Sequence, residues 1–210
     1  TFSFVLYLIP GLFGAPLKAI SAFLPHPSTH DFDLTSMIRK QRVVQSDVAT
    51  TLCDEKPLYS DFLHLPHDLE GYFDYEQALA CAKKQNKPLF LDFTGHGCGD
   101  CKKMEAQVWS DPEVLKRLQN DYIIVALYVD ERMELPEKKW VTSVLDGKVK
   151  KTIGAVNADF RATRYRVNAQ PYYVLIDTNE EMLTEPFTYN TDVEEFIEFL
   201  DKGKKEFNNQ

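Results

Sequence analysis

Two cysteines stand three positions apart in the segment Cys98-Gly99-Asp100-Cys101. An apolar run ends just before them, and the pattern predicts that a helix starts at the pair. The amide groups and partial positive charge at a helix start favour ionisation of the first thiol. The spacing lets the second sulfur attack a mixed disulfide that the first has formed. The pair therefore predicts thiol–disulfide exchange, with Cys98 as nucleophile and Cys101 as resolving thiol.

Two other uses of this pair remain open. It could supply half of a zinc site, together with His96, but a closed structural zinc site needs four ligands. Cys53 and Cys81 lack the spacing of a second ligand pair, so we expect no metal. It could also be a structural disulfide, although a bridge across so short a loop constrains the unfolded chain little. We expect Cys81 to pack as a small core residue, and a regulatory role for Cys53 has no support.

The overall composition is that of a folded, acidic protein. The chain has 210 residues, 44% of them apolar and 12% aromatic, which is enough for one domain with chain left over. The formal net charge is -8. A negative field repels phosphate backbones, so nucleic acid is not an expected partner.

The first residues are the most hydrophobic part of the chain. Thr1 to Leu17 carry no charge, and the apolar character continues to Leu24. A helix of 17 residues covers about 26 Å, slightly less than a bilayer core. We therefore predict that residues 1–24 form a truncated or broken membrane helix of a longer protein. The alternative is a hydrophobic tail that packs on the domain or stays disordered. Residues 25–69 are predicted to be a linker, and residues 70–205 a compact domain.

Within the compact domain, helices and strands are expected to alternate, which indicates an α/β fold. A charged segment over 131–158 interrupts the order, and Asp146-Gly147 predicts a hairpin or surface insertion there. The expected helices span 75–82, the segment that starts at the cysteine pair, 112–119, 157–167 and 193–200. The expected strands span 89–94, 122–129, 172–176 and 183–189.

The order of Asp92, Cys98, Cys101 and Pro171 along these elements resembles the thioredoxin fold, a central mixed β-sheet flanked by helices, over about residues 70 to 205. Within that superfamily the chain resembles the C-terminal domain of the DsbD family of thiol:disulfide interchange proteins. The narrower likeness rests on the active segment 97–105, on the proline loop 168–173, and on residues 9–18, which are similar to the end of that family's membrane domain.

The resemblance assigns roles to several residues. It implies that Cys98 is the exposed nucleophile and that Pro171 is a cis-proline lining the groove for a partner chain. Gln170, Gly99 and Asp100 would complete this substrate-binding surface.

The resemblance also implies that Asp92 is a buried carboxylate under the disulfide. Burial should raise the pKa of Asp92 and let it relay a proton, unless it is an exposed residue at a strand end. Glu105, one turn after Cys101, could face the sulfurs in the same way or be a solvated helix residue.

The implied activity is protein-disulfide reduction in an electron relay. The donor would be the membrane domain of the parent protein, and the acceptors would be oxidised periplasmic proteins. The domain would be periplasmic and anchored to the bacterial inner membrane. No organic cofactor is implied beyond the redox-active Cys98–Cys101 disulfide. A free-standing reductase, a disulfide isomerase and a non-catalytic peptide-binding module are the alternatives. Because nearby carboxylates oppose thiolate formation, we expect no strongly depressed thiol pKa and a centre that reduces its partners.

Overall fold

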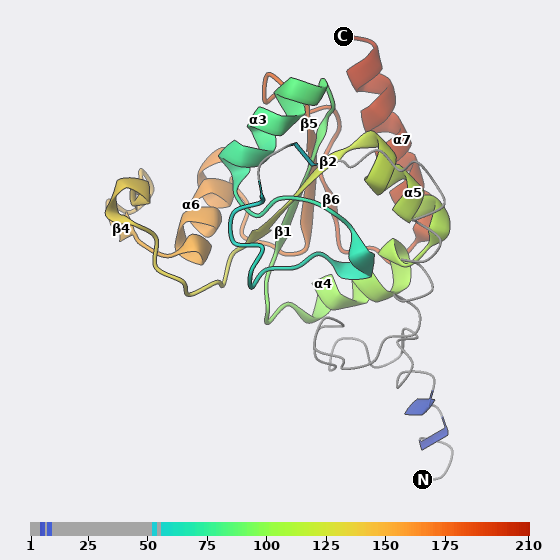
Figure 1. The fold of residues 1–210 in the computed structure, drawn as a ribbon, viewed down its shortest axis with the longest axis horizontal. Helices are drawn as coiled ribbons and strands as arrows, with labels where there is room; N and C mark the ends of the chain where they lie inside the picture. The colour runs from blue at the N-terminus through green and yellow to red at the C-terminus, as the bar shows by residue number, and fades with distance from the viewer. Residues whose placement is uncertain (1–4, 7, 10–51, 54–55) are drawn as a thin grey trace.

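The computed structural model describes residues 5–6, 8–9, 52–53 and 56–210 (Figure 1). The predicted membrane segment lies almost wholly outside these residues, as does most of the predicted linker. Within the described part of the chain, no helix is both long and apolar enough to cross a bilayer.

The core of the fold is a mixed four-stranded sheet. Its strands are β1 (Leu89–Thr94), β2 (Ile123–Tyr128), β5 (Tyr172–Ile176) and β6 (Phe187–Thr188), in the order β2-β1-β5-β6. β1 and β2 are parallel, whereas β5 is antiparallel to both β1 and β6. This confirms the α/β class, the mixed sheet and the expected strands at β1, β2 and β5, although β2 stands at the end of the strand order.

Alternation along β1 decides which face of the sheet each side chain occupies. Leu91 and Phe93 belong to one hydrophobic cluster, and Phe90 belongs to the other. Asp92 therefore lies on the Phe90 face, as do its cross-strand neighbours Ala126 and Tyr173.

Helices cover both faces of the sheet (Figure 1). The Leu91 face packs against α3 (Tyr75–Gln85) and α6 (Ile153–Tyr165). The Phe90 face packs against α4 (Gly99–Met104), the π-helical turn η5 (Glu105–Trp109), α5 (Pro112–Asp121) and α7 (Val193–Asn208). The cysteine pair therefore belongs to the layer that faces Asp92.

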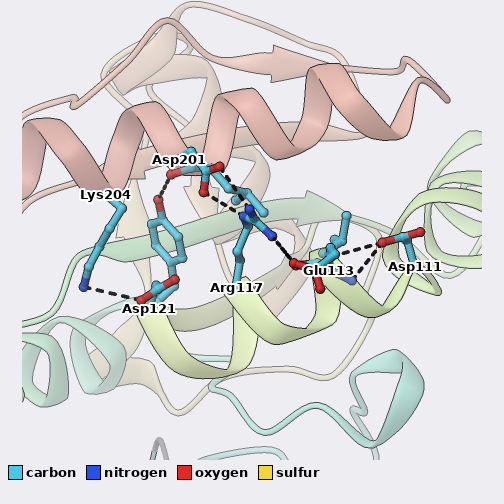
Figure 2. Close-up of polar contacts among 9 residues, drawn as sticks. Asp111, Glu113, Arg117, Asp121, Asp201 and Lys204 are labelled. Carbon is cyan, nitrogen blue, oxygen red and sulfur yellow. Dashed lines mark hydrogen bonds and ion pairs between the residues drawn. The ribbon is translucent and has the colours of Figure 1, made fainter.

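Local signals explain where α5 begins and how it is held. Asp111 is the N-cap and accepts hydrogen bonds from the backbone N–H of Glu113 and Val114, with Pro112 in the first turn, as predicted. Figure 2 shows Arg117 between Glu113 on the same helix and Asp201 on α7, at 2.9 and 2.7 Å. These contacts join α5 to α7, which continues to Asn208 through the charged segment after Leu200.

The region between β2 and α6 contains the predicted hairpin. Strands β3 (Val141–Thr142) and β4 (Val149–Lys150) pair around a turn in which Gly147 has a positive φ of 68°. Helix α6 starts at Ile153, earlier than predicted, because the Thr152 hydroxyl caps it and Gly154 packs against the backbone of Glu131. A β-carbon on Gly154 would lie 2.5 Å from the Glu131 nitrogen.

The predicted strand 183–189 is shorter than expected. Only Phe187 and Thr188 form β6, because Pro186 has no N–H to donate to a ladder. Leu183 instead donates its N–H to the Leu175 carbonyl at 2.9 Å.

The segment before α3 packs on the domain, although the sequence placed it in the linker. Leu63 and Leu69 are buried in the core. Tyr72 forms a parallel bridge with Val125 of β2, in which its N–H donates to the Ile124 carbonyl at 2.8 Å.

A disulfide joins Cys53 to Cys81 on α3. Cys81 is buried in the core, as expected, but the sequence analysis did not predict its bond to Cys53. Spacing along the chain could not reveal this bond, because it depends on residues near Cys53 folding back beside α3.

Candidate active site

The cysteine pair lies where β1 leads into α4. Cys98 is the N-cap residue of α4, and its Sγ accepts a hydrogen bond from the backbone N–H of Cys101 at 3.1 Å. The two cysteines form a disulfide with their Cα atoms 5.3 Å apart. The same amide would donate to a Cys98 thiolate, so this geometry favours ionisation of the first thiol.

The predicted exposure of Cys98 is wrong for this disulfide form. The exposed fractions are 5% for Cys98 and 2% for Cys101. An attacking thiol must therefore reach the more accessible of two covered sulfurs.

Asp92 lies in the centre of β1 and is buried, with 3% of its surface exposed. The alternative of an exposed aspartate at a strand end is therefore wrong. Its Oδ1 has no hydrogen-bond partner among the described residues. Burial raises the pKa of Asp92 well above its ordinary value, and the negative charge of Glu105 raises it further.

Glu105 is the first residue of η5 and is partly buried. Burial raises the pKa of Glu105 to about 7, while the positive charge of Lys102 acts in the opposite direction. Its backbone N–H donates to the Cys101 carbonyl, which ties it to the turn that carries the disulfide. Glu105 is therefore more than a solvated helix residue, and Asp92 and Glu105 form a pair of interacting carboxyl groups.

Two tyrosines that the sequence analysis did not single out belong to the same electrostatic environment. Tyr173 is fully buried opposite Asp92, and Tyr128 donates its hydroxyl to the His64 carbonyl at 3.0 Å. Burial raises the pKa of each phenol, and the charges of Asp92 and Glu105 add to the effect. Both tyrosines therefore remain neutral hydroxyl groups at ordinary pH.

The loop before Cys98 is held by residues that follow β2. Asp130 accepts hydrogen bonds from the backbone N–H of His96 and of Gly97, both at 2.9 Å. The Glu131 carboxylate lies 2.8 Å from Nε2 of His96. An acidic pair directly after a central strand was a signal for this contact that the sequence analysis missed.

The proline loop lies at the same end of the sheet. The Gln170–Pro171 peptide bond is cis, as the resemblance implied. Pro171 immediately precedes β5, whose residue Tyr172 pairs with Phe93 near the end of β1. This register brings the loop and the start of the cysteine helix to one edge of the sheet.

The predicted substrate-binding residues of the cysteine turn are partly exposed. Gly99 and Asp100 form the first turn of α4. Asp100 accepts a hydrogen bond from Lys103 at 2.9 Å, and this contact raises the pKa of Lys103. Lys103 is therefore ion-paired with Asp100.

The zinc alternative requires several ligands in one place. Within the described ranges, no three His, Cys, Asp or Glu side chains form a group that could hold a metal ion. His96, the ligand considered with the cysteine pair, contacts Glu131 and lies over the Tyr128 ring, with 4.6 Å between ring centroids.

Comparisons with known proteins agree on the fold. The family model described as a thioredoxin-like domain matches residues 75–204. A solved structure titled DsbH oxidoreductase is 20% identical, has a TM-score of 0.50, and covers 79% of this chain and 98% of its own. No curated protein matches the chain.

Two further solved structures are similar. A thioredoxin from Thermus thermophilus is 23% identical, with a TM-score of 0.45 and coverage of 63% of this chain and 85% of its own. The reduced C-terminal domain of DsbD from Neisseria meningitidis is 19% identical, with a TM-score of 0.41 and coverage of 61% of this chain and 92% of its own. At such identities, similarity to solved structures speaks for the fold alone.

Proposed function

Because the chain belongs to the thioredoxin-like domain family, we propose that it is a thiol–disulfide oxidoreductase that works through Cys98 and Cys101. The observation that carries the proposal is the disulfide between these residues at the start of α4, on the sheet face that holds the buried Asp92. A structural bridge would need neither an unpartnered buried carboxyl nor a loop held in place before Cys98.

The reaction is a two-electron exchange. In the reduced protein the Cys98 thiolate attacks one sulfur of a substrate disulfide, forms a mixed disulfide and releases the other sulfur as a thiolate. Cys101 then loses its proton and attacks Cys98 Sγ. The Cys98–Cys101 disulfide forms, and the second substrate thiolate leaves. The protein has lost two electrons and two protons, and the substrate has become a dithiol.

The buried carboxyl pair supports the second step. Cys101 is covered, so its proton needs a nearby acceptor rather than bulk water. Burial raises the pKa of Asp92 well above its ordinary value and that of Glu105 to about 7, so each carboxylate binds a proton more readily than an exposed one. We assign Asp92 as the proton acceptor for Cys101, with Glu105 setting the charge state of Asp92.

In its finer form, the proposal is a protein-disulfide reductase of the DsbD type. The active segment 97–105 and the proline loop 168–173 support this likeness. The membrane domain of the parent protein would supply dithiol electrons, and oxidised periplasmic proteins would accept them, with no organic cofactor. The Cys53–Cys81 disulfide adds independent support for an extracytoplasmic location, because such bonds persist mainly in oxidising compartments.

Trapping with Cys101→Ser tests the proposed reaction. We expect this variant to accumulate a mixed disulfide on Cys98, identifiable by mass, because the resolving sulfur is missing. Cys98→Ser is the matched control and should trap nothing. A biological function that stays intact in Cys98→Ser, without disulfide exchange, would instead favour a non-catalytic peptide-binding module.

A second measurement separates the reductase from the isomerase. The reductase should leave a substrate with free thiols, whereas an isomerase should restore activity to a protein with scrambled disulfides without net reduction. Absence of membrane spans before Thr1 in the parent protein would remove the relay and leave a free-standing enzyme.

A further inference from the structure

Arg161 is a charged side chain that the proposed exchange chemistry does not use, and it is buried beside the proline loop. It lies on α6, and 3% of its surface is exposed. Burial is the cause that lowers the pKa of its guanidinium. A buried cation is costly unless its donors are satisfied. The Nε of Arg161 has no hydrogen-bond partner among the described residues, so the contacts of Nη1 and Nη2 define what it does.

The hydrogen bonds of Arg161 converge on one short segment. Its Nη1 donates to the Ala169 carbonyl at 2.8 Å and to Oε1 of Gln170 at 3.4 Å. Its Nη2 donates to Oδ1 of Asn168 at 2.6 Å. All three acceptors are neutral, and they belong to the three residues that precede Pro171.

The neighbouring arginine on the same helix shows a different arrangement. Arg164 is more exposed, and its Nη1 forms an ion pair with Glu180 at 3.0 Å. It therefore binds the turn after β5, at the opposite end of that strand from Pro171. The two arginines provide a matched pair: one is directed at the proline loop and the other is not.

We propose that Arg161 is a positioning residue that fixes segment 168–170, so that Gln170 and Pro171 meet the polypeptide around a substrate disulfide in a preset conformation. This inference rests on the proposed function and names the substrate class for which it matters. A loop that is already ordered loses less conformational entropy when a partner chain binds. The benefit applies only to substrates long enough to contact the loop.

The planar fork of guanidinium is needed for this role. Two nitrogens of Arg161 reach a backbone carbonyl and two side-chain oxygens at the same time. Lysine keeps the positive charge but offers a single ammonium group, so it cannot reproduce this arrangement.

The test compares a polypeptide substrate with a small one. The rate of insulin reduction, with dithiothreitol as the electron donor, measures the reduction of a disulfide within a polypeptide chain. Dithiobis(nitrobenzoate), reacting with the reduced protein, reports the reactivity of Cys98 without groove contacts. We expect Arg161→Gln and Arg161→Lys to raise KM for insulin by roughly threefold to tenfold, a shift of the size that one lost binding contribution produces. In both variants, kcat for insulin and the rate of reaction with dithiobis(nitrobenzoate) should stay within about twofold of the wild-type values.

Two further variants complete the experiment. Asn168→Ala removes one acceptor from the exposed loop and should raise KM for insulin in the same direction, even if the Arg161 variants fold poorly. Arg164→Gln is the control on α6 and should leave KM unchanged.

Two results would overturn the proposal. One is an unchanged KM for insulin in Asn168→Ala and the folded Arg161 variants. The other is an equal loss with both substrates, which would show a purely structural role. If the wild-type protein reduces neither substrate, the proposed function itself fails, and that result is distinct from both.

Discussion

Asp92 on β1 and Glu105 on η5 interact through charge, because the carboxylate of Glu105 is one of the causes that raise the pKa of Asp92. The chain thus places two acidic groups on the layer that carries its reactive sulfurs. The first two predictions follow from this pair.

Glu105→Gln should change how stability depends on pH. Burial raises the pKa of Glu105 from 4.5 to about 7, so within this window the folded state holds a proton that the unfolded state releases. The wild-type free energy of unfolding should therefore fall as pH rises from 4.5 to 7, by up to about 3 kcal/mol from this group. Urea unfolding should show a smaller fall in Glu105→Gln. The exposed Glu76→Gln should keep the wild-type slope, and an unchanged slope in Glu105→Gln would contradict the prediction.

The carboxyl pair should also control the acidity of the reactive thiol. Negative charge near a thiol disfavours the thiolate, so Asp92→Asn and Glu105→Gln should each lower the pKa of Cys98 in the reduced protein. Thiolate absorbance during a pH titration measures this. A strongly acidic Cys98 in the wild-type protein, or a rise in its pKa in either variant, would contradict the expectation.

Asp130→Asn should weaken the loop before Cys98. The carboxylate accepts the N–H groups of His96 and Gly97, whereas an amide has only one oxygen and would turn a donor toward the second N–H. Leaving such a group unpaired costs about 1–3 kcal/mol where it is buried, and less at this more exposed loop. We expect a lower kcat for disulfide reduction with a smaller change in thermal stability.

Asp146→Asn is the matched control, because Asp146 also accepts a backbone N–H, that of Lys148, but in the hairpin. An equal effect on kcat in both variants would mean that the loop contact has no special role.

Removal of the Cys53–Cys81 disulfide should lower stability more than removal of the reactive one. It links residues 28 positions apart, for which the loop-closure entropy predicts about 3–4 kcal/mol. The separation of three between Cys98 and Cys101 gives roughly 2 kcal/mol or less. Denaturant unfolding of the Cys53→Ala/Cys81→Ala and Cys98→Ala/Cys101→Ala variants compares the two losses. Equal losses would contradict this account.

Features encoded by neighbouring residues could be predicted from the sequence. The run Leu89 to Thr94 reads as a strand because it is short and mostly apolar and aromatic. Asp111-Pro112 marks a helix start through the capping chemistry of those two residues. The cysteine motif is equally local. The family resemblance placed Asp92 under the disulfide, and the cost of burying a carboxyl within a strand agreed with that role.

Features that depend on distant parts of the chain could not be predicted in this way. Asp130 and Arg161 are ordinary charged residues in sequence. The role of Asp130 arises only when β2 brings it beside a loop 34 positions earlier, and that of Arg161 only when the chain after α6 folds back onto its guanidinium. Cys53 is equally uninformative until its segment lies along α3. The family likeness supplied the cis-proline, which the position of Pro171 alone did not establish.

The bridge between Tyr72 and Val125 has a practical consequence for shortened versions of the protein. The family match begins at residue 75, after this bridge and after the buried Leu63 and Leu69. A chain that starts at residue 75 would lack Tyr72. The outer main-chain N–H and C=O groups of β2 that Tyr72 pairs with would then be able to pair with another molecule. Such a fragment should aggregate during expression, whereas one that begins before Cys53 keeps that side of the sheet shielded.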